Sequence, residues 1–142
     1  MKDTKVVKYM TKTPTSVVAS DPLKTAWSIL EKESFNHLPV VDDKAKVVGM
    51  ISRTDIENFK KIFSYMDSEK KTLLDNLTNL DVMSNPVKTI EQNQTMQEAN
   101  DVMLSERIRA LVVLQGTDNV VGIISETDIL HFYNELYNTA SQ

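Results

Sequence analysis

The sequence predicts an α/β (α+β) fold made of two pseudo-symmetric repeats, each a small β-sheet flanked by helices. The first observation is a repeated octet: GMISRTDI, residues 49–56, returns as GIISETDI, residues 122–129, with six of eight letters unchanged. The second is that valine-rich runs typical of buried strands alternate with segments of helical periodicity in both halves. A fold built twice from one unit explains both observations.

The similarity between the halves extends beyond the octet, at a constant offset of 73 residues. The aligned apolar pairs are Met10 with Met83, Val17 with Ile90, Leu23 with Met96, Ala26 with Ala99, Leu38 with Leu111, and Val40 with Val113. Each copy is expected to run strand, helix, strand, strand, helix. The predicted boundaries are 1–66 for the first repeat with its following helix, 67–79 for a helical connector, and 80–142 for the second repeat with its C-terminal helix.

The first helix of each copy has a start signal followed by an apolar stripe. In the first copy, Ser20-Asp21-Pro22 places a capping residue before a proline, a combination typical of a helix start. In the second copy the helix is expected to begin at Thr95. The stripes that these helices are expected to bury are Leu23, Ala26, Trp27 and Leu30, and Met96, Ala99, Val102 and Met103.

A β-hairpin is predicted after each of these helices. The runs HLPVV, residues 37–41, and ALVVL, residues 110–114, suit strands covered on both faces. Turn residues follow, and then VVGMIS, residues 47–52, and VVGIIS, residues 120–125, supply the second strand of each hairpin.

The connector between the copies is expected to be helical and packed, because it contains no glycine or proline. Its two apolar stripes are Phe59, Ile62, Phe63 and Met66, and Leu73, Leu74, Leu77 and Leu80. The final segment repeats the helix after the octet, with Ile129, Phe132, Tyr133, Leu136 and Tyr137 on its apolar side.

Composition excludes several classes of function. The chain has 41% hydrophobic and 25% charged residues, as ordinary soluble globular proteins do. It has no cysteine, hence no disulfide or thiolate site, and its two histidines are too few for a metal cluster. A net charge of −4 gives no general attraction to nucleic acid. Because neither a signal peptide nor an 18-residue apolar run is present, we expect a cytoplasmic protein with no membrane partner.

The octet permits two interpretations. Ser52-x-x-Asp55 and Ser125-x-x-Asp128 both fit a helix capping box, in which the two side chains bind backbone N–H groups. The same residues at a helix N-terminus could instead bind a ligand, because an aspartate accepts two hydrogen bonds from a diol such as ribose. The glycine of each octet, Gly49 or Gly122, would allow the close approach of a ligand or of another backbone.

At these residues the sequence resembles a tandem pair of cystathionine-β-synthase (CBS) domains, the arrangement called a Bateman module. The resemblance covers residues 6–134 and depends on PVVD, residues 39–42, and on GMISRTD, residues 49–55, each of which has a counterpart in the second half. It implies a regulatory, non-catalytic module whose two copies form clefts for adenosine-containing ligands. Such ligands are AMP, ADP, ATP, S-adenosylmethionine and cyclic di-AMP, and paired modules of this family often form homodimers.

The resemblance also implies roles for individual residues. Ser52 and Asp55 would contact ribose in one cleft, and Ser125 and Asp128 in the other. Arg109 and His37 would reach phosphates; the alternative for Arg109 is an ion pair with Glu106. The region that contacts the base would comprise Ser16, Val17, Pro39, Thr89 and Ile90. Here the alternative for Ser16 and Thr89 is that they are simple edge hydroxyls.

The two clefts are expected to differ in affinity. Arg53 of the first octet is replaced by Glu126 in the second, and Arg109 stands where the first copy has Asn36. An arginine attracts a phosphate and a glutamate repels it. The predicted function is therefore an adenine-nucleotide sensor that signals to an unknown effector protein. A ligand-free dimerisation module is the alternative. An enzyme is the least supported class, because no nucleophile motif, phosphate-binding glycine loop or metal-ligand spacing is present.

Overall fold

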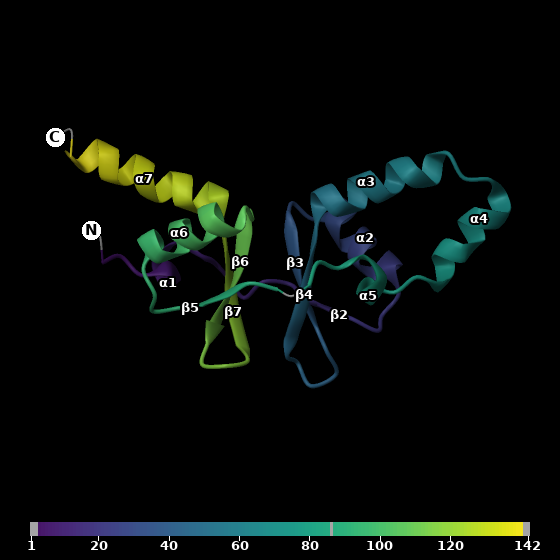
Figure 1. The fold of residues 1–142 in the computed structure, drawn as a ribbon, viewed down its shortest axis with the longest axis horizontal. Helices are drawn as coiled ribbons and strands as arrows, with labels where there is room; N and C mark the ends of the chain where they lie inside the picture. Colours follow the sequence, from purple (N-terminus) through teal and green to yellow (C-terminus); the bar gives the residue numbers. More distant parts are fainter. Residues whose placement is uncertain (1–2, 86, 141–142) are drawn as a thin grey trace. The chain divides into compact units, whose positions relative to one another are not determined.

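The computed structural model describes residues 3–85 and 87–140 of the chain, and Figure 1 shows the path of its backbone. Its elements, in chain order, are α1 (Val6–Tyr9), β1 (Thr11–Lys12), β2 (Val17–Val18), α2 (Leu23–Lys32), β3 (His37–Val41), β4 (Val47–Ser52), α3 (Arg53–Ser64), α4 (Ser68–Leu73), the 3₁₀ turn η1 (Leu74–Asn76), α5 (Asn79–Val82), β5 (Thr89–Glu91), α6 (Met96–Glu106), β6 (Ala110–Gln115), β7 (Asn119–Ser125) and α7 (Glu126–Ala140).

These elements form two compact units. The first-repeat unit comprises Thr15–Val87, and the second-repeat unit comprises Met1–Pro14 together with Lys88–Gln142. Each unit contains the predicted order of strand, helix, strand, strand, helix, as β2-α2-β3-β4-α3 in one and β5-α6-β6-β7-α7 in the other. The predicted fold class, with two small sheets flanked by helices, is confirmed.

The two sheets share one topology. In the first-repeat unit the strand order is β2-β3-β4, with β2 parallel to β3 and β3 antiparallel to β4. In the second-repeat unit the order is β1-β7-β6-β5, with β5 parallel to β6 and β7 antiparallel to both of its neighbours. Both hairpins have a register shift at the same place, after Val40 and after Val113. A β-bulge therefore occurs at equivalent positions of the two repeats.

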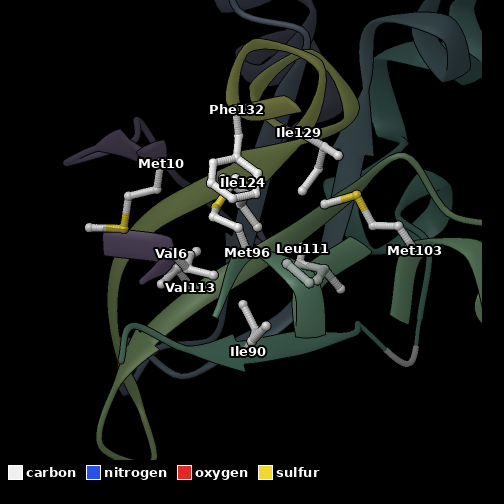
Figure 2. Close-up of a cluster of buried hydrophobic side chains, with 11 residues drawn as sticks. Val6, Met10, Ile90, Met96, Met103, Leu111, Val113, Ile124, Ile129 and Phe132 are labelled. Carbon is white, nitrogen blue, oxygen red and sulfur yellow. The ribbon is translucent and has the colours of Figure 1, made fainter. Parts of the chain in front are cut away.

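Each unit has its own hydrophobic core between one face of its sheet and its helices. The core of the second-repeat unit (Figure 2) contains Val6, Met10, Ile90, Met96, Ala99, Met103, Leu111, Val113, Ile124, Ile129 and Phe132. The core of the first-repeat unit contains Val17, Leu23, Ala26, Leu30, Leu38, Val40, Ile51 and Ile56. The predicted helix stripes and strand runs supply most of both cores, as their periods require.

A short segment that precedes one repeat packs on the other repeat. Residues 4–11, which we call the N-terminal docking segment, pack in the second-repeat unit, and residues 77–84, the connector docking segment, pack in the first-repeat unit. The N-terminal segment adds β1 to the edge of its sheet, where Thr11 pairs with Ile123. The connector segment makes the equivalent bridge between Ser84 and Met50.

The octet glycines allow this close approach of another backbone. A Cβ atom on Gly122 would lie 2.5 Å from Sδ of Met10 and 2.8 Å from the carbonyl oxygen of Thr11. A Cβ atom on Gly49 would lie 2.6 Å from Sδ of Met83 and 2.7 Å from the carbonyl oxygen of Ser84. Of the two explanations that the sequence left open for these glycines, the structure supports the approach of a docking segment.

The connector differs in part from its prediction. It is helical at α3, α4 and η1, but α5 is a separate short helix rather than a continuation. Leu77 packs against the first-repeat core, whereas Ile62 and Leu80 are 55% and 56% exposed and do not pack in the core of this chain. The reason for Leu80 is that its backbone N–H is bound to Ala19, and this places the neighbouring Asn79 in the interior instead. The side chains of Leu73 and Leu74 lie outside the described part of the structure.

The helix starts were predicted to within a few residues. Thr95 is the N-cap of α6 and forms a capping box with Glu98, as expected from a start at this residue. Helix α2 begins later than Ser20-Asp21 indicates: its N-cap is Pro22, whose side chain has no hydrogen-bonding group and so cannot cap the helix. The N–H of Leu23 binds the carbonyl of Leu77 instead, so the connector segment satisfies the first turn.

Candidate functional site

The first octet forms a complete capping box at the start of α3. The hydroxyl oxygen of Ser52 accepts the backbone N–H of Asp55 at 3.0 Å, and Oδ2 of Asp55 accepts the backbone N–H of Ser52 at 3.1 Å. The capping interpretation of this pair is therefore confirmed. The second carboxylate oxygen of Asp55 takes no part in these bonds, and both residues are only half-buried. A ligand role for the same pair is compatible with this geometry.

The second octet makes the same arrangement at the start of α7. Oδ2 of Asp128 accepts the backbone N–H of Ser125 at 2.9 Å, and the Ser125 hydroxyl oxygen accepts the backbone N–H of Asp128 at 3.4 Å. The hydroxyl also donates to the same Oδ2, at 3.1 Å. Here too the second carboxylate oxygen is outside these bonds. Each unit thus presents one carboxylate and one hydroxyl at a helix N-terminus, where the helix dipole is positive.

We call the two helix starts just described the Ser-x-x-Asp corners. The predicted phosphate-binding residues lie beside them. His37 pairs directly with Ser52 across the β3-β4 hairpin, and in the second repeat Ala110 takes the position opposite Ser125. Arg109 precedes Ala110, and its carbonyl accepts the N–H of Glu126 at 2.9 Å. Arg109 and His37 therefore each stand next to one Ser-x-x-Asp corner, although they are not in equivalent positions.

The strand register shows which of the other predicted residues lie on the same face of the sheet as the serine of a Ser-x-x-Asp corner. Side chains alternate between the two faces of a sheet, so in β3 Leu38 and Val40 face the core while His37 and Pro39 face the other side. Ser52 shares this side with them because it pairs with His37. In the second sheet Thr89 pairs with Val112, and both lie on the side away from the core.

The remaining residues of the predicted base region fall into two groups. The side chains of Val17 and Ile90 belong to the two hydrophobic cores, with 6% and 3% of their surfaces exposed. Ser16 and Thr89, which precede them, are exposed. Of each pair, only the polar residue offers a side chain outside the core.

The cations near the corners are used differently. The guanidinium of Arg53 donates to the carbonyl oxygens of Glu33 and Phe35, at 2.8 and 2.5 Å, and to Oδ1 of Asn36 at 3.2 Å. It therefore holds the end of α2 and has few donors left for a phosphate.

Arg109 has no side-chain partner among residues 3–85 and 87–140 and is exposed. Glu106, its alternative partner, lies 3.7 Å from Lys88 instead. The ion pair with Glu106, which was the alternative role for Arg109, is therefore not formed, and the guanidinium of Arg109 remains available to a ligand.

Other kinds of site are not found in the described part of the chain. No group of three or more His, Asp or Glu side chains there could hold a metal ion. None of the described helices is both long enough and apolar enough to cross a membrane. A pocket of about 260 Å³ in the first-repeat unit lies against α2 and α3, beside Trp27 and Phe63, and contains none of the predicted site residues.

Two structural roles in the first-repeat unit escaped the sequence reasoning. Arg53 was considered only as a possible attraction for phosphate, because nothing local in the sequence indicates that it binds the end of the preceding helix. Asn79 is completely buried, although polar residues of this kind are mostly exposed. The available signal for Asn79 was its alignment with Val6, an apolar residue, at the offset of 73.

Comparison with known proteins gives a family and several relatives. A model of the CBS domain matches residues 6–60 and 80–135. The uncharacterized protein MJ1404 of Methanocaldococcus jannaschii is 29% identical in an alignment of length 144 that covers 96% of this chain and 33% of that protein. The 5′-AMP-activated protein kinase subunit gamma-3 of Sus scrofa is 27% identical over 116 residues, which cover 80% of this chain and 22% of the subunit.

A solved structure also matches nearly the whole chain. The CBS domain pair of protein MJ0100, in complex with 5′-methylthioadenosine and S-adenosyl-L-methionine, superimposes with a TM-score of 0.74 at 27% identity. The match covers 93% of this chain and 97% of that one. By contrast, this chain spans only a third or less of the two curated relatives, at 33% and 22% of their lengths.

Proposed function

Because the chain belongs to the CBS domain family, we propose that it is a regulatory module that binds an adenine nucleotide at its Ser-x-x-Asp corners and signals to a partner protein. AMP, ADP and ATP are the proposed ligands, and S-adenosylmethionine or cyclic di-AMP are the related alternatives. The observation that carries this proposal is that Asp55 and Asp128 each keep one carboxylate oxygen outside the capping box that holds the side chain at a helix N-terminus.

The proposed ribose contacts follow from this geometry. A ribose presents two neighbouring hydroxyl groups, and a carboxylate with one free oxygen can accept a hydrogen bond from at least one of them. Ser52 and Ser125 add a hydroxyl beside each carboxylate. The complex of the MJ0100 domain pair with two adenosine-containing molecules supports an adenosine ligand for this chain as well.

The proposed phosphate contacts differ between the corners. Arg109 is exposed and permanently charged, and its guanidinium can bind a phosphate through two donors. His37 takes the corresponding role in the first repeat, beside Ser52. We propose that phosphate-bearing ligands bind the two corners with unequal affinity.

The proposed base contacts are the exposed hydroxyls of Ser16 and Thr89, with Pro39 and the backbone of Val17 and Ile90 beside them. The proposed assembly is a cytoplasmic homodimer that regulates an effector protein without catalysing a reaction itself. For ligand binding to regulate anything, the ligand must bind two states of the module with different affinities.

A second candidate function is a dimerisation module with no ligand. One observation favours it: both capping boxes are complete within the protein, so the serines and aspartates have a structural role in either case. Under this alternative, loss of Asp55 or Asp128 lowers stability by about 1 kcal/mol and changes no ligand response.

Thermal unfolding with added ligands separates the two candidates. A ligand at 100 times its Kd should stabilise the parent protein by about 2.7 kcal/mol, which raises Tm by roughly 5–10 °C. The ligands to compare are AMP, ADP, ATP, S-adenosylmethionine and cyclic di-AMP, with GTP as the control. We predict that an adenine ligand raises Tm and that Asp55→Ala or Asp128→Ala abolishes the rise.

The matched control is Asp81→Ala. Asp81 forms the same kind of capping box with Thr78, outside both octets. Its replacement should cost a similar amount of stability but preserve the ligand-induced rise. If no adenine ligand raises Tm of the parent, or if all three variants keep the rise unchanged, the proposed sites are refuted and the ligand-free module is favoured.

A further inference from the structure

The two docking segments bind their units through the same backbone hydrogen bonds. In the second-repeat unit, Val6 N–H donates to Gln94 O at 2.8 Å and Val7 N–H to Gln92 O at 3.1 Å. The equivalent bonds in the first-repeat unit run from Asn79 to Asp21 and from Leu80 to Ala19, both at 3.0 Å. A third equivalent pair joins Met96 N–H to Thr4 O at 2.8 Å and Leu23 N–H to Leu77 O at 2.9 Å.

The methionine contacts are also equivalent. Met10 lies over Gly122 and Met83 lies over Gly49 with almost the same geometry. The backbone and the methionine therefore give each docking segment no preference between the two repeats. A preference can therefore come from the side chains that differ between the segments.

Asn79 is the first such difference. Its side chain is completely buried, and Nδ2 donates to Val18 O at 2.8 Å and to Oγ1 of Thr25 at 3.3 Å. Oδ1 has no hydrogen-bond partner among the described residues. The second repeat has Glu98 at the position of Thr25, and its carboxylate caps α6 and accepts from Gln94. An asparagine docked on the second repeat would lack the threonine hydroxyl and would enter the apolar site of Val6.

Tyr9 is the second difference. Its ring packs edge-to-face on Phe132, with 5.3 Å between centroids, and its hydroxyl donates to Glu135. That hydrogen bond raises the pKa of the Tyr9 phenol. At the offset of 73, the first repeat offers Phe59 in place of Phe132 but Ile62 in place of Glu135. A tyrosine docked there would find the ring but lose its acceptor.

We propose that Asn79 and Tyr9 are specificity residues that assign the connector segment to a first repeat and the N-terminal segment to a second repeat, and that they disfavour the opposite docking within a chain or between two copies. Asn79 suits this role because its buried amide is only partly satisfied even where it docks, and on the second repeat it would also lose the hydroxyl of Thr25. Single buried asparagines fix the register of coiled coils in the same way, at a cost in stability.

Engineered cysteines can test this assignment, because the chain has none of its own. Ser84 and Met50 form an antiparallel bridge with two backbone hydrogen bonds, a spacing that a disulfide can accommodate. Ile123 is the equivalent of Met50 and pairs with Thr11. With cysteine at positions 84, 50 and 123 of one chain, mild oxidation and peptide mapping report which repeat the connector segment occupies.

The parent chain should form the 84–50 linkage almost alone. Asn79→Val combined with Val82→Tyr gives the connector segment the two specificity residues of the N-terminal segment. We expect this change to raise the 84–123 linkage about tenfold, within one chain or as a disulfide-linked dimer, because the cost of docking on the second repeat is removed. Leu80→Val, between the two positions, is the matched control and should leave the linkages unchanged.

An unchanged distribution in the folded double variant would overturn the proposal, as would an equal change in the Leu80→Val control. If circular dichroism finds the double variant unfolded, Asn79→Val alone decides the question. It should be at least as stable as the parent in urea, because it replaces a partly unsatisfied amide by the residue found at Val6. Its 84–123 linkage should rise severalfold, and the absence of a rise counts against the proposal.

Discussion

Gly122 carries only a hydrogen atom at the point where the N-terminal docking segment crosses the edge of the second sheet. Two kinds of atom surround that hydrogen: the flexible end of Met10 and the fixed carbonyl oxygen of Thr11. The methionine can move aside, but the carbonyl belongs to the strand that pairs with β7. The glycine is therefore required by the backbone of the docking segment, and Gly49 is required in the same way.

We predict that Gly122→Ala lowers the free energy of unfolding by about 1–3 kcal/mol, the usual cost of an overpacked site. Urea denaturation measures the loss. Adding Met10→Ala should recover only part of it, because the new Cβ still lies 2.8 Å from the Thr11 carbonyl. The control is Gly116→Asn, at φ +76° with open space around it, where asparagine tolerates the backbone. Full recovery in the double variant would mean that the sulfur alone is the obstacle.

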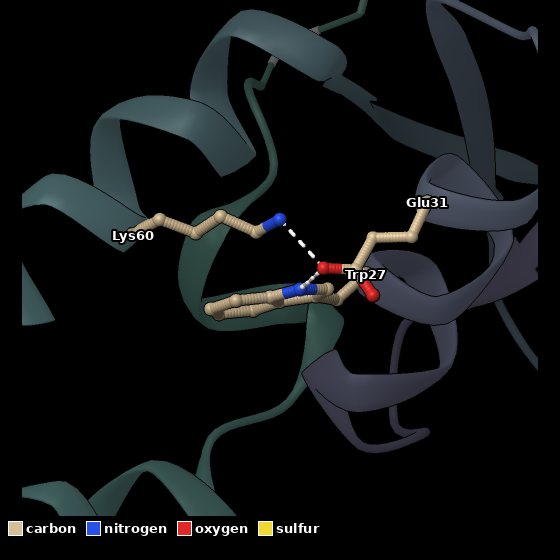
Figure 3. Close-up of polar contacts among 3 residues, drawn as sticks. All are labelled: Trp27, Glu31 and Lys60. Atoms are coloured by element: carbon tan, nitrogen blue, oxygen red, sulfur yellow. Dashed lines mark hydrogen bonds and ion pairs between the residues drawn. The ribbon is translucent and has the colours of Figure 1, made fainter.

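At the scale of elements, α2 and α3 are joined by a small polar and aromatic cluster (Figure 3). The carboxylate of Glu31 accepts from Nε1 of Trp27 and from Nζ of Lys60, both at 2.6 Å. The Lys60 ammonium also lies 5.0 Å from the centre of the Trp27 ring, and that ring is parallel to Phe63 at 6.0 Å. One carboxylate thus connects α2 and α3, for which the sequence pattern gave two separate apolar stripes and no contact between them.

These contacts make the stability of the cluster depend on pH. The hydrogen bond from Lys60, and then that from Trp27, lower the pKa of Glu31 below its ordinary value. Its stabilising effect is present above the unfolded-state pKa of about 4.3 and is lost as the pH falls through the lower folded-state pKa. We predict that Glu31→Gln is less stable than the parent at pH 6 and that the difference becomes smaller as the pH is lowered to 3.

Urea unfolding at both pH values, followed by the fluorescence of the single tryptophan, measures this difference. Glu57→Gln on the exposed surface of α3 is the matched control and should behave like the parent at both pH values. A difference for Glu31→Gln that is as large at pH 3 as at pH 6 would show that the carboxylate charge is not its source.

The positions of these elements were largely predictable, because helical and strand periodicity are local properties. Residues 37–41 and 47–52 form strands with the predicted bounds, and Thr95 caps α6 as predicted. The capping role of the octets was predictable for the same reason. The roles of Arg53 and Asn79 were not, because they depend on carbonyl groups brought close only by folding.

At the scale of the whole molecule, the repeats in the sequence and the compact units in the structure have different boundaries. The predicted boundary at residue 66 separates the first repeat from the segment 77–84 that packs on it, because an alignment of two similar copies does not reveal on which copy a segment docks. In the structure the first-repeat unit is one continuous stretch, Thr15–Val87, whereas the second-repeat unit needs both Met1–Pro14 and Lys88–Gln142.

This difference predicts how fragments behave. Residues 15–87 include the connector docking segment, which binds the N–H groups of Leu23 and Met50 and covers Gly49. Residues 1–66 lack it, so these backbone groups lose their partners and Met83 no longer packs at the edge of the sheet. We expect the fragment 15–87 to unfold cooperatively in urea and to give dispersed amide resonances, and the fragment 1–66 to do neither.

The control for this comparison is a fragment of residues 15–76, which ends just before the docking segment. If the segment closes the unit, this shorter fragment should fail as the fragment 1–66 does, and adding a synthetic peptide of residues 77–85 should restore part of its structure. Equal stability of the fragments 1–66 and 15–87 would instead mean that the repeat folds without its docking segment. In that case the backbone bonds at Leu23 and Met50 would contribute little to the unit.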